Sequence, residues 1–135
     1  MKCLIVDDDA VSRNIFKTIL AKYAKCDLVS NGTNAIAAYK TSLDKGKPYD
    51  LIILDIMMPD INGDEVLKFI RFSEKAKNIY FPDCAKVIIA TGLDDFKNRQ
   101  IEKNLNKESE AFLLKSPGIH QELLNTIRKL GFNKI

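Results

Sequence analysis

The stretch LIILDIMMPDING (residues 51–63) places four apolar residues directly before an aspartate and a turn-forming segment. Apolar runs of this length, without alternating polar residues, are typical of strands that are covered on both faces, as in a parallel sheet. Similar runs occur at residues 3–6 (CLIV), 87–90 (VIIA) and 111–114 (AFLL). The four runs predict four strands of one sheet, and a weaker run at residues 26–30 (CDLVS) predicts a fifth strand at an edge.

Segments with helical spacing of apolar residues separate these runs. The apolar residues of the first segment are Val11, Ile15, Phe16, Ile19 and Leu20, and those of the last are Leu123, Ile127 and Leu130. Residues 33–45 and 63–76 show the same spacing, whereas residues 94–107 are mostly polar. We expect a helix in each segment, with the helix at 94–107 lightly anchored and largely exposed.

Strands that alternate with helices in this way predict βαβ units with right-handed crossovers. The expected fold class is α/β, a three-layer α/β/α sandwich with helices on both faces of the sheet. The chain of 135 residues has the length of one ordinary domain, and no linker rich in Pro, Gly or Ser interrupts it. We therefore expect a single domain over residues 1–135, and no further domain after Gly131.

Composition excludes several other classes of protein. No apolar run approaches the roughly 18 residues of a membrane helix, and the start MKCLIVDDDA lacks the features of a secretory signal, so we expect a cytoplasmic protein without a membrane partner. The net charge of +3 is spread over mixed-sign stretches, which does not favour direct binding of nucleic acid. Cys3, Cys26 and Cys84 form no C-x-x-C pair, and we expect reduced, mostly buried thiols.

Polar residues follow the apolar runs at the positions where parallel sheets bind their ligands, beyond the carboxyl ends of the strands. They are Asp7, Asp8 and Asp9 after the first run, Asp55 after the third, Thr91 and Gly92 after the fourth, and Lys115 after the fifth. Carboxylates brought this close repel one another unless a cation joins them. Oxygen ligands without His or Cys suit a hard cation, Mg²⁺ or Mn²⁺.

This set of residues suits transfer of a phosphoryl group. Asp55 can attack an electrophilic phosphorus atom while the cation and Lys115 neutralise the phosphoryl oxygens. Thr91 can supply a hydroxyl group to one of these oxygens. Asp9 is better explained as the cap of the first helix, and His120 as a surface residue.

The segments LIVDDDAVSR, LIILDIMMPDING, VIIATG and FLLKSP resemble, in order and spacing, the receiver domains of response regulators in two-component and phosphorelay signalling. The resemblance covers nearly the whole chain and implies a flavodoxin-like sheet with strand order 2-1-3-4-5. It implies that Asp55 is both the phosphoacceptor and a ligand of Mg²⁺, and that Asp8 binds the ion directly. It also implies that Asp7 binds the ion through water and that Met57 binds it through its backbone carbonyl.

The resemblance assigns further roles outside the acidic set. Thr91 is implied to be the switch hydroxyl, Lys115 the invariant lysine and Phe112 the aromatic switch. Met57 and Leu93 are implied to flank the path of the hydrolytic water, and because both are apolar we expect slow self-dephosphorylation. The segment FLLKSP departs from the family, which usually has proline directly after the lysine, because Ser116 separates Lys115 from Pro117. Other positions implied by the resemblance are Met58 and Pro59 in the loop after the acceptor, Asn62 as a turn residue and Gly63 in the turn that follows.

The resemblance implies a sensor histidine kinase or a histidine phosphotransfer protein as phosphoryl donor. We expect a downstream protein target to bind the helix at 94–107, the strand at 111–114 and the last helix, and we do not expect an enzyme. An aspartyl-phosphate phosphatase of the haloacid-dehalogenase type requires a second acidic residue where Met57 stands. An EF-hand loop aligned on Gly63 places Met58 and Phe69 at ligand positions, which excludes it. A receiver that acts by binding alone stays open as an alternative.

Overall fold

A computed structural model of the chain describes residues 1–92 and 108–132. Its elements are β1 (Lys2–Val6), α1 (Ala10–Leu20), β2 (Lys25–Val29), α2 (Gly32–Asp44), β3 (Leu51–Leu54), α3 (Gly63–Ala76), β4 (Lys86–Thr91), β5 (Ala111–Leu114) and α5 (Ile119–Lys129). The strands form one parallel sheet in the order β2-β1-β3-β4-β5. The α/β class and the strand order are confirmed. The helix expected at residues 94–107 lies outside the described residues.

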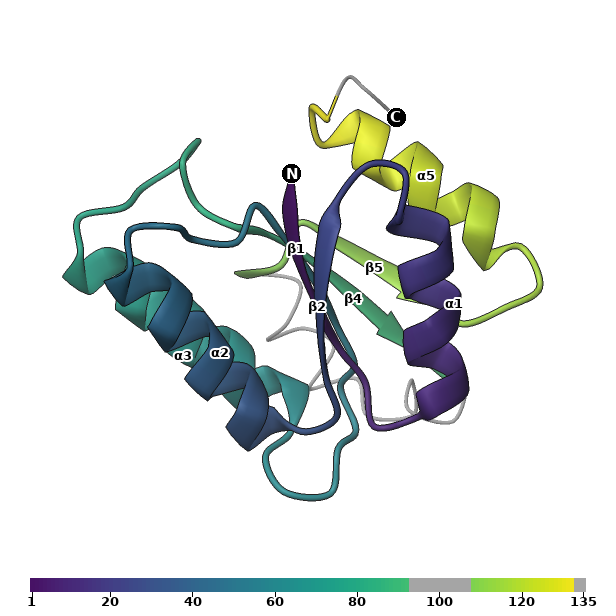
Figure 1. The fold of residues 1–135 in the computed structure, drawn as a ribbon, viewed down its shortest axis with the longest axis horizontal. Helices are drawn as coiled ribbons and strands as arrows, with labels where there is room; N and C mark the ends of the chain where they lie inside the picture. The colour runs from purple at the N-terminus through teal and green to yellow at the C-terminus, as the bar shows by residue number, and fades with distance from the viewer. Residues whose placement is uncertain (93–107, 133–135) are drawn as a thin grey trace.

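The described helices cover both faces of the sheet. Figure 1 shows α1 and α5 on one face and α2 and α3 on the other. Each face has its own apolar core, which includes Phe16, Leu20 and Ile127 on the α1–α5 side and Tyr39, Leu67 and Ile70 on the α2–α3 side. This is the three-layer sandwich that the alternation of strands and helices predicts.

Burial of the strands follows their place in the sheet. The three inner strands β1, β3 and β4 are buried almost throughout, as their apolar runs predict. β2 lies at one edge with three exposed residues, which confirms the prediction for residues 26–30. β5 lies at the other edge and is half-buried, with β4 as a neighbouring strand on one side only. Phe112 packs against the core under α2 and α3, and Ala111 and Leu113 pack against the core under α1 and α5, in line with the prediction that both faces are covered.

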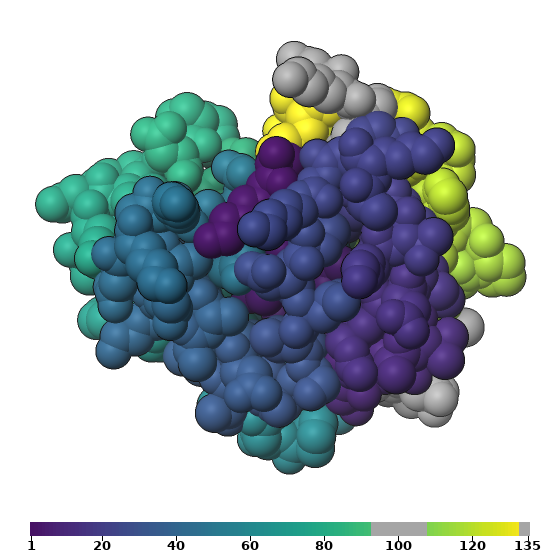
Figure 2. All heavy atoms as spheres, in the orientation of Figure 1, coloured from purple at the N-terminus to yellow at the C-terminus, as the bar shows by residue number. Residues whose placement is uncertain are grey.

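Helix α1 buries only some of the apolar residues that its sequence offers. Phe16, Ile19 and Leu20 are buried, whereas Val11 and Ile15 are 65% and 44% exposed. Apolar residues occupy more than one face of this helix, and only one face can pack on the sheet. Figure 2 shows α1 on the outer surface beside β2, with α2 on the other side of that strand. Val11 and Ile15 are therefore apolar residues at the surface.

Side chains cap the first three helices at their N-termini. Asp9 accepts hydrogen bonds from the Ser12 amide (3.2 Å) and the Ser12 hydroxyl (2.8 Å), which confirms its predicted role. Asn31 accepts from the Asn34 amide (2.7 Å) at α2, and Asn62 accepts from the Glu65 amide (3.0 Å) at α3. These bonds satisfy amide groups that have no partner within the helix.

The turn between β3 and α3 depends on Gly63. Its amide donates to the carbonyl of Ile56 at 2.7 Å, and a Cβ atom at this position would meet the Asp55 carbonyl and lie 2.9 Å from the Ile56 Cα. Backbone atoms cannot move aside as a flexible side chain can. A residue without a side chain is therefore required for α3 to begin directly against the end of β3.

Arg71 ties α3 to the start of β5. Its guanidinium donates to Glu74 (2.8 Å), to the Ala85 carbonyl (2.9 Å) and to Glu110 (2.9 Å). Glu74 is 2% exposed and accepts from the Ala85 amide at 2.7 Å, so its buried charge is paired and hydrogen-bonded. The three cysteines are free, with Cys3 buried and Cys26 and Cys84 partly buried. None of the described helices is both long and apolar enough to cross a membrane.

Candidate functional site

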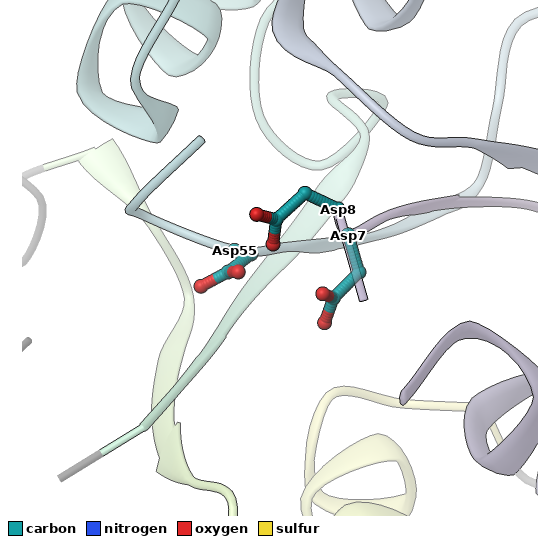
Figure 3. Close-up of side chains that lie close together, drawn as sticks. All are labelled: Asp7, Asp8 and Asp55. Carbon is teal, nitrogen blue, oxygen red and sulfur yellow. The ribbon is translucent and has the colours of Figure 1, made fainter. Parts of the chain in front are cut away.

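Three carboxylates meet at the carboxyl end of the two central strands. Asp7 and Asp8 follow β1, Asp55 follows β3, and each offers a carboxylate oxygen within 4.8 Å of the others (Figure 3). Backbone pairing continues past the strands and sets this level, since the Asp55 amide donates to the Val6 carbonyl at 3.0 Å and the Asp7 amide to the Val29 carbonyl at 3.2 Å. The parallel sheet therefore brings together acidic residues that are far apart in the sequence.

Lys115 completes this cluster from the edge strand. Its Nζ atom lies 2.6 Å from Oδ2 of Asp7 and 3.5 Å from Oδ2 of Asp55. The Lys115 amide donates to the Thr91 carbonyl at 2.8 Å, which fixes its backbone at the end of β4. The long side chain then reaches across the end of β4 to the carboxylates of the central strands.

Burial and charge oppose each other in the Asp7–Lys115 pair. Burial raises the pKa of Asp7, which is 1% exposed, while Lys115 and the Asp9 amide act to lower it, and the net pKa lies above the ordinary value. Burial lowers the pKa of Lys115, but its contacts with Asp7 and Asp55 outweigh burial and the net pKa is raised. The lysine is therefore held in its charged form by the acidic cluster.

The charges of the cluster leave room for a cation. Lys115 forms ion pairs with two of the three carboxylates, those of Asp7 and Asp55, and a carboxylate oxygen of Asp8 lies within 4.8 Å of theirs. The donors are oxygen atoms, Asp7 and Asp55 are buried, and Asp8 is exposed on the solvent side. Such a set fits a hard divalent ion that retains some of its water, as Mg²⁺ does. Met57, two residues beyond Asp55, lies in the adjoining loop and is 51% exposed.

The remaining predicted residues surround this cluster. Thr91 is fully buried at the end of β4, the strand between those of Asp55 and Lys115. Phe112 is half-buried in β5 opposite Ile89 and packs against the core under α2 and α3. Leu93 lies outside the described residues. The structure thus brings together Asp7, Asp8, Asp55 and Lys115. Thr91 lies at the same edge of the sheet, at the end of the neighbouring strand β4.

The residue inserted after Lys115 is accommodated in a turn. The Ser116 carbonyl accepts from the Ile119 amide at 3.0 Å, and α5 begins at Ile119. Among the described residues the cis peptide bond is that between Phe81 and Pro82, so Pro117 is preceded by a trans bond. The insertion therefore leaves the position of Lys115 intact and shapes the surface next to it.

Sequence reasoning did not find a groove beside the acidic cluster. It has a volume of about 580 Å³ between α1 and the loop that leads into α5. Its lining residues are Val11, Asn14, Ile15, Thr18, Ile19, Ser116, Pro117, Ile119 and His120. The signal available in the sequence is the excess of apolar residues on α1, of which Val11 and Ile15 stay exposed. His120 is an exposed residue, as expected.

Comparison with known proteins identifies the family of this chain. The chain matches the model of the response regulator receiver domain over residues 3–128. Hybrid signal transduction histidine kinase L of Dictyostelium discoideum is 35% identical over 133 residues, which cover 98% of this chain and 7% of that protein. Transcriptional regulatory protein CusR of Escherichia coli (strain K12) is 32% identical over 131 residues, which cover 96% of this chain and 51% of CusR. The chain spans about half or less of the length of these two relatives.

Solved structures agree with this result. The response regulator TrrA of Thermotoga maritima, in complex with Mg²⁺ and BeF, has a TM-score of 0.73 and 28% identity over 96% of this chain and 97% of that chain. The response regulator domain of Thermotoga maritima CheB has a TM-score of 0.71 and 26% identity over 98% of this chain and 96% of that chain. The chain belongs to the response regulator receiver domain family.

The acidic cluster predicts that Mg²⁺ stabilises the folded protein. A cation that binds only the folded state raises stability by about 1.4 kcal/mol at tenfold its dissociation constant, or about 3–6 °C in melting temperature for a domain of this size. We expect millimolar Mg²⁺ to produce such a rise and Asp8→Ala to abolish it. Thermal unfolding followed by circular dichroism measures both.

Asp9→Ala is the matched control for this experiment. It removes the cap of α1 and should lower the melting temperature without the cation, yet the rise on adding Mg²⁺ should persist. A rise that survives Asp8→Ala and is lost in Asp9→Ala would assign the ion to a different set of ligands.

Proposed function

We propose that Asp55 accepts a phosphoryl group in a reaction that requires a divalent cation, and that this change switches a protein-binding surface of a single receiver domain. The observation that carries the proposal is the position of Asp55 between the acidic pair and Lys115, whose Nζ lies 3.5 Å from the Asp55 Oδ2. The complex of TrrA with Mg²⁺ and BeF supports the same cation here. Mn²⁺ can replace Mg²⁺ in such an oxygen site.

Each side chain of the cluster has a distinct part in the transfer. A carboxylate oxygen of Asp55 forms a bond to phosphorus as the bond between phosphorus and the donor nitrogen breaks, and the donor imidazole leaves with the electron pair of that bond. Asp8, Asp7 through water, and the Met57 carbonyl would hold Mg²⁺, which supplies positive charge to the phosphoryl oxygens when bound. Lys115 offers a second positive charge, and the Thr91 hydroxyl can donate a hydrogen bond to a phosphoryl oxygen.

The partners follow from this chemistry. The donor is a phosphohistidine of a sensor histidine kinase or a phosphotransfer protein, in line with the similarity to a hybrid histidine kinase. The target binds residues 94–107, which the sequence predicts to be a helix, together with β5 and α5, and the protein acts as a phosphoacceptor that slowly loses its own phosphoryl group. Free cysteines fit the reducing conditions of the cytoplasm, where we place the protein.

The groove beside the cluster is the surface on which we place the donor. A phosphohistidine must reach Asp55 from outside the sheet, so the protein that carries it has to cover the surface around the acidic cluster. Val11 and Ile15 form an exposed apolar patch there, and Pro117 and Ile119 extend it from the loop after Lys115. Exposed apolar residues with polar neighbours are typical of protein interfaces.

Phosphorylation of Asp55 can be tested with a small-molecule donor. Incubated with acetyl phosphate and Mg²⁺, the protein should gain one phosphoryl group that is stable in acid and labile in base. Asp55→Asn should not be labelled, and a chelator should suppress labelling of the wild-type protein. Intact-mass spectrometry measures the gain, and equal labelling of the Asn variant would refute Asp55 as the acceptor.

The groove is tested by comparing two donors. Ile15→Asp should slow transfer from a phosphotransfer domain that labels the wild-type protein, by roughly tenfold or more if a central apolar contact of the interface is lost. Labelling by acetyl phosphate should be unchanged, since that donor needs no docking surface. Phe72→Asp is the control, because Phe72 is 73% exposed on α3 and distant from the groove lining. Equal slowing by both variants would contradict the assignment.

The lifetime of the phosphorylated state depends on access of water. Met57 and Leu93 are apolar, so neither side chain can orient a hydrolytic water by a hydrogen bond. The double variant Met57→Asn and Leu93→Glu should lose its phosphoryl group on the order of tenfold faster, which corresponds to a little over 1 kcal/mol of barrier. Release of inorganic phosphate after removal of the donor measures this rate. Equal lifetimes would show that these residues do not control hydrolysis.

A further inference from the structure

The loop between β3 and α3 is hydrogen-bonded to a helix that is distant in sequence. The carboxylate of Asp60 accepts from the Gly32 amide (3.0 Å), the Thr33 amide (2.9 Å) and the Thr33 hydroxyl (2.5 Å). Gly32 and Thr33 form the first turn of α2, whose own cap is Asn31. Asp60 therefore supplies α2 with a second cap that comes from a different part of the chain.

The contact between loop and helix is also close. A Cβ atom at Gly32 would lie 2.5 Å from the Ile61 carbonyl oxygen and 2.7 Å from the Ile61 Cβ. Backbone atoms of the loop thus rest directly on the first residue of α2, and a side chain at position 32 would push the loop away. The three hydrogen bonds and this contact act at adjacent residues and fix the same piece of loop.

The other contacts of this loop do not fix the orientation of its peptide groups. In the described structure, the backbone groups of residues 57–61 make no backbone-to-backbone hydrogen bond. Met58 and Ile61 pack against the apolar core, but apolar packing sets a position without fixing the orientation of peptide groups. The bonds to Asp60 are the directional link between this part of the loop and the rest of the fold.

We propose that Asp60 is a positioning residue for the cation: by clamping the loop to the N-terminus of α2, it restricts the orientations open to the Met57 carbonyl and so favours the one that binds the ion. The proposal rests on the proposed function, in which that carbonyl binds Mg²⁺. Met57 lies three residues before Asp60, and Asn62 and Gly63 anchor the far end of the loop in α3. With both ends fixed, the freedom left to the peptide after Met57 depends on the clamp.

A carboxylate is the side chain that this clamp requires. One oxygen accepts from Gly32 and the other from both donors of Thr33. An amide could accept with its single oxygen only, and its NH₂ group would face donors. The bonds to Thr33 hold the pKa of Asp60 well below its ordinary value, so the acceptor stays ionised at neutral pH.

The clamp also makes α2 sensitive to the cation. If Asp60 strengthens binding of Mg²⁺, then Mg²⁺ must strengthen the bonds of Asp60 to α2 by the same factor, because coupling between two events is reciprocal. The amides of Gly32 and Thr33 should then exchange their hydrogens more slowly when Mg²⁺ is bound. A residue that merely stabilised α2 would not produce this effect.

The test compares two caps of the same helix. Asp60→Ala removes the clamp, whereas Asn31→Ala removes a cap of α2 and leaves the loop untouched. Asp60→Ala should weaken Mg²⁺ binding roughly three- to tenfold, because the loop then lacks the capping hydrogen bonds that hold it in the conformation that binds the ion. Asn31→Ala should change the Mg²⁺ affinity less than about twofold. Isothermal titration calorimetry with MgCl₂ measures the affinities, and thermal unfolding shows that both variants fold.

A second variant tests the geometry of the clamp. Thr33→Val keeps the shape of the side chain and removes the hydroxyl donor, so it should weaken Mg²⁺ binding less than Asp60→Ala does. The double variant Asp60→Ala, Thr33→Val should bind Mg²⁺ as tightly as Asp60→Ala alone, since both changes break the same set of hydrogen bonds. Equal Mg²⁺ affinity of the wild type and Asp60→Ala, or an equal loss in Asn31→Ala, would overturn the proposal. A wild-type protein that bound no Mg²⁺ would overturn both the clamp and the proposed function, whereas normal Mg²⁺ binding without phosphorylation would leave the clamp standing.

Discussion

Repulsion among three carboxylates at the ends of two neighbouring strands is the constraint on which the rest of this structure depends. Asp7, Asp8 and Asp55 are held within a few ångström by the register of β1 and β3, and Asp7 and Asp55 are buried. The fold offsets this cost with the ammonium group of Lys115, which reaches the cluster from the far side of β4. Such a set of carboxylates suits a divalent ion, and the positive charges of the ion and of Lys115 suit a phosphoryl group.

Much of the fold could be predicted because its strands are short apolar runs with polar ends. The bounds of β3, β5 and α3 agree with the predicted ranges, and the other described strands differ by one residue at their ends. The buried face of α1 could not be predicted, since its sequence offers more apolar residues than one face can bury, and the choice depends on how the helix sits on the sheet. The half-burial of β5 likewise depends on its place at the edge, which its residues alone do not state.

The site could be predicted to the extent that it follows from topology. Parallel strands bring their carboxyl ends to one edge, so Asp7, Asp8, Asp55 and Lys115 were expected to meet. The bonds of Asp60 to Thr33 and the groove between α1 and α5 could not be foreseen in this way. Both depend on how a loop and a helix from different βα units lie against each other. No pattern in the sequence links Asp60 to Thr33, or α1 to the loop before α5.

The two glycines that flank the loop after Asp55 have a consequence for how such a chain can vary. Gly63 rests on the backbone of Asp55 and Ile56, and Gly32 rests on Ile61, so the loop is held between two contacts that admit no side chain. Insertions or deletions are usually tolerated where a loop is free to bulge into solvent. Here an added residue would have to break one of the two contacts, so the loop should keep a constant length among descendants of this sequence, whereas the exposed residues 80–83 of the next connection can vary in length.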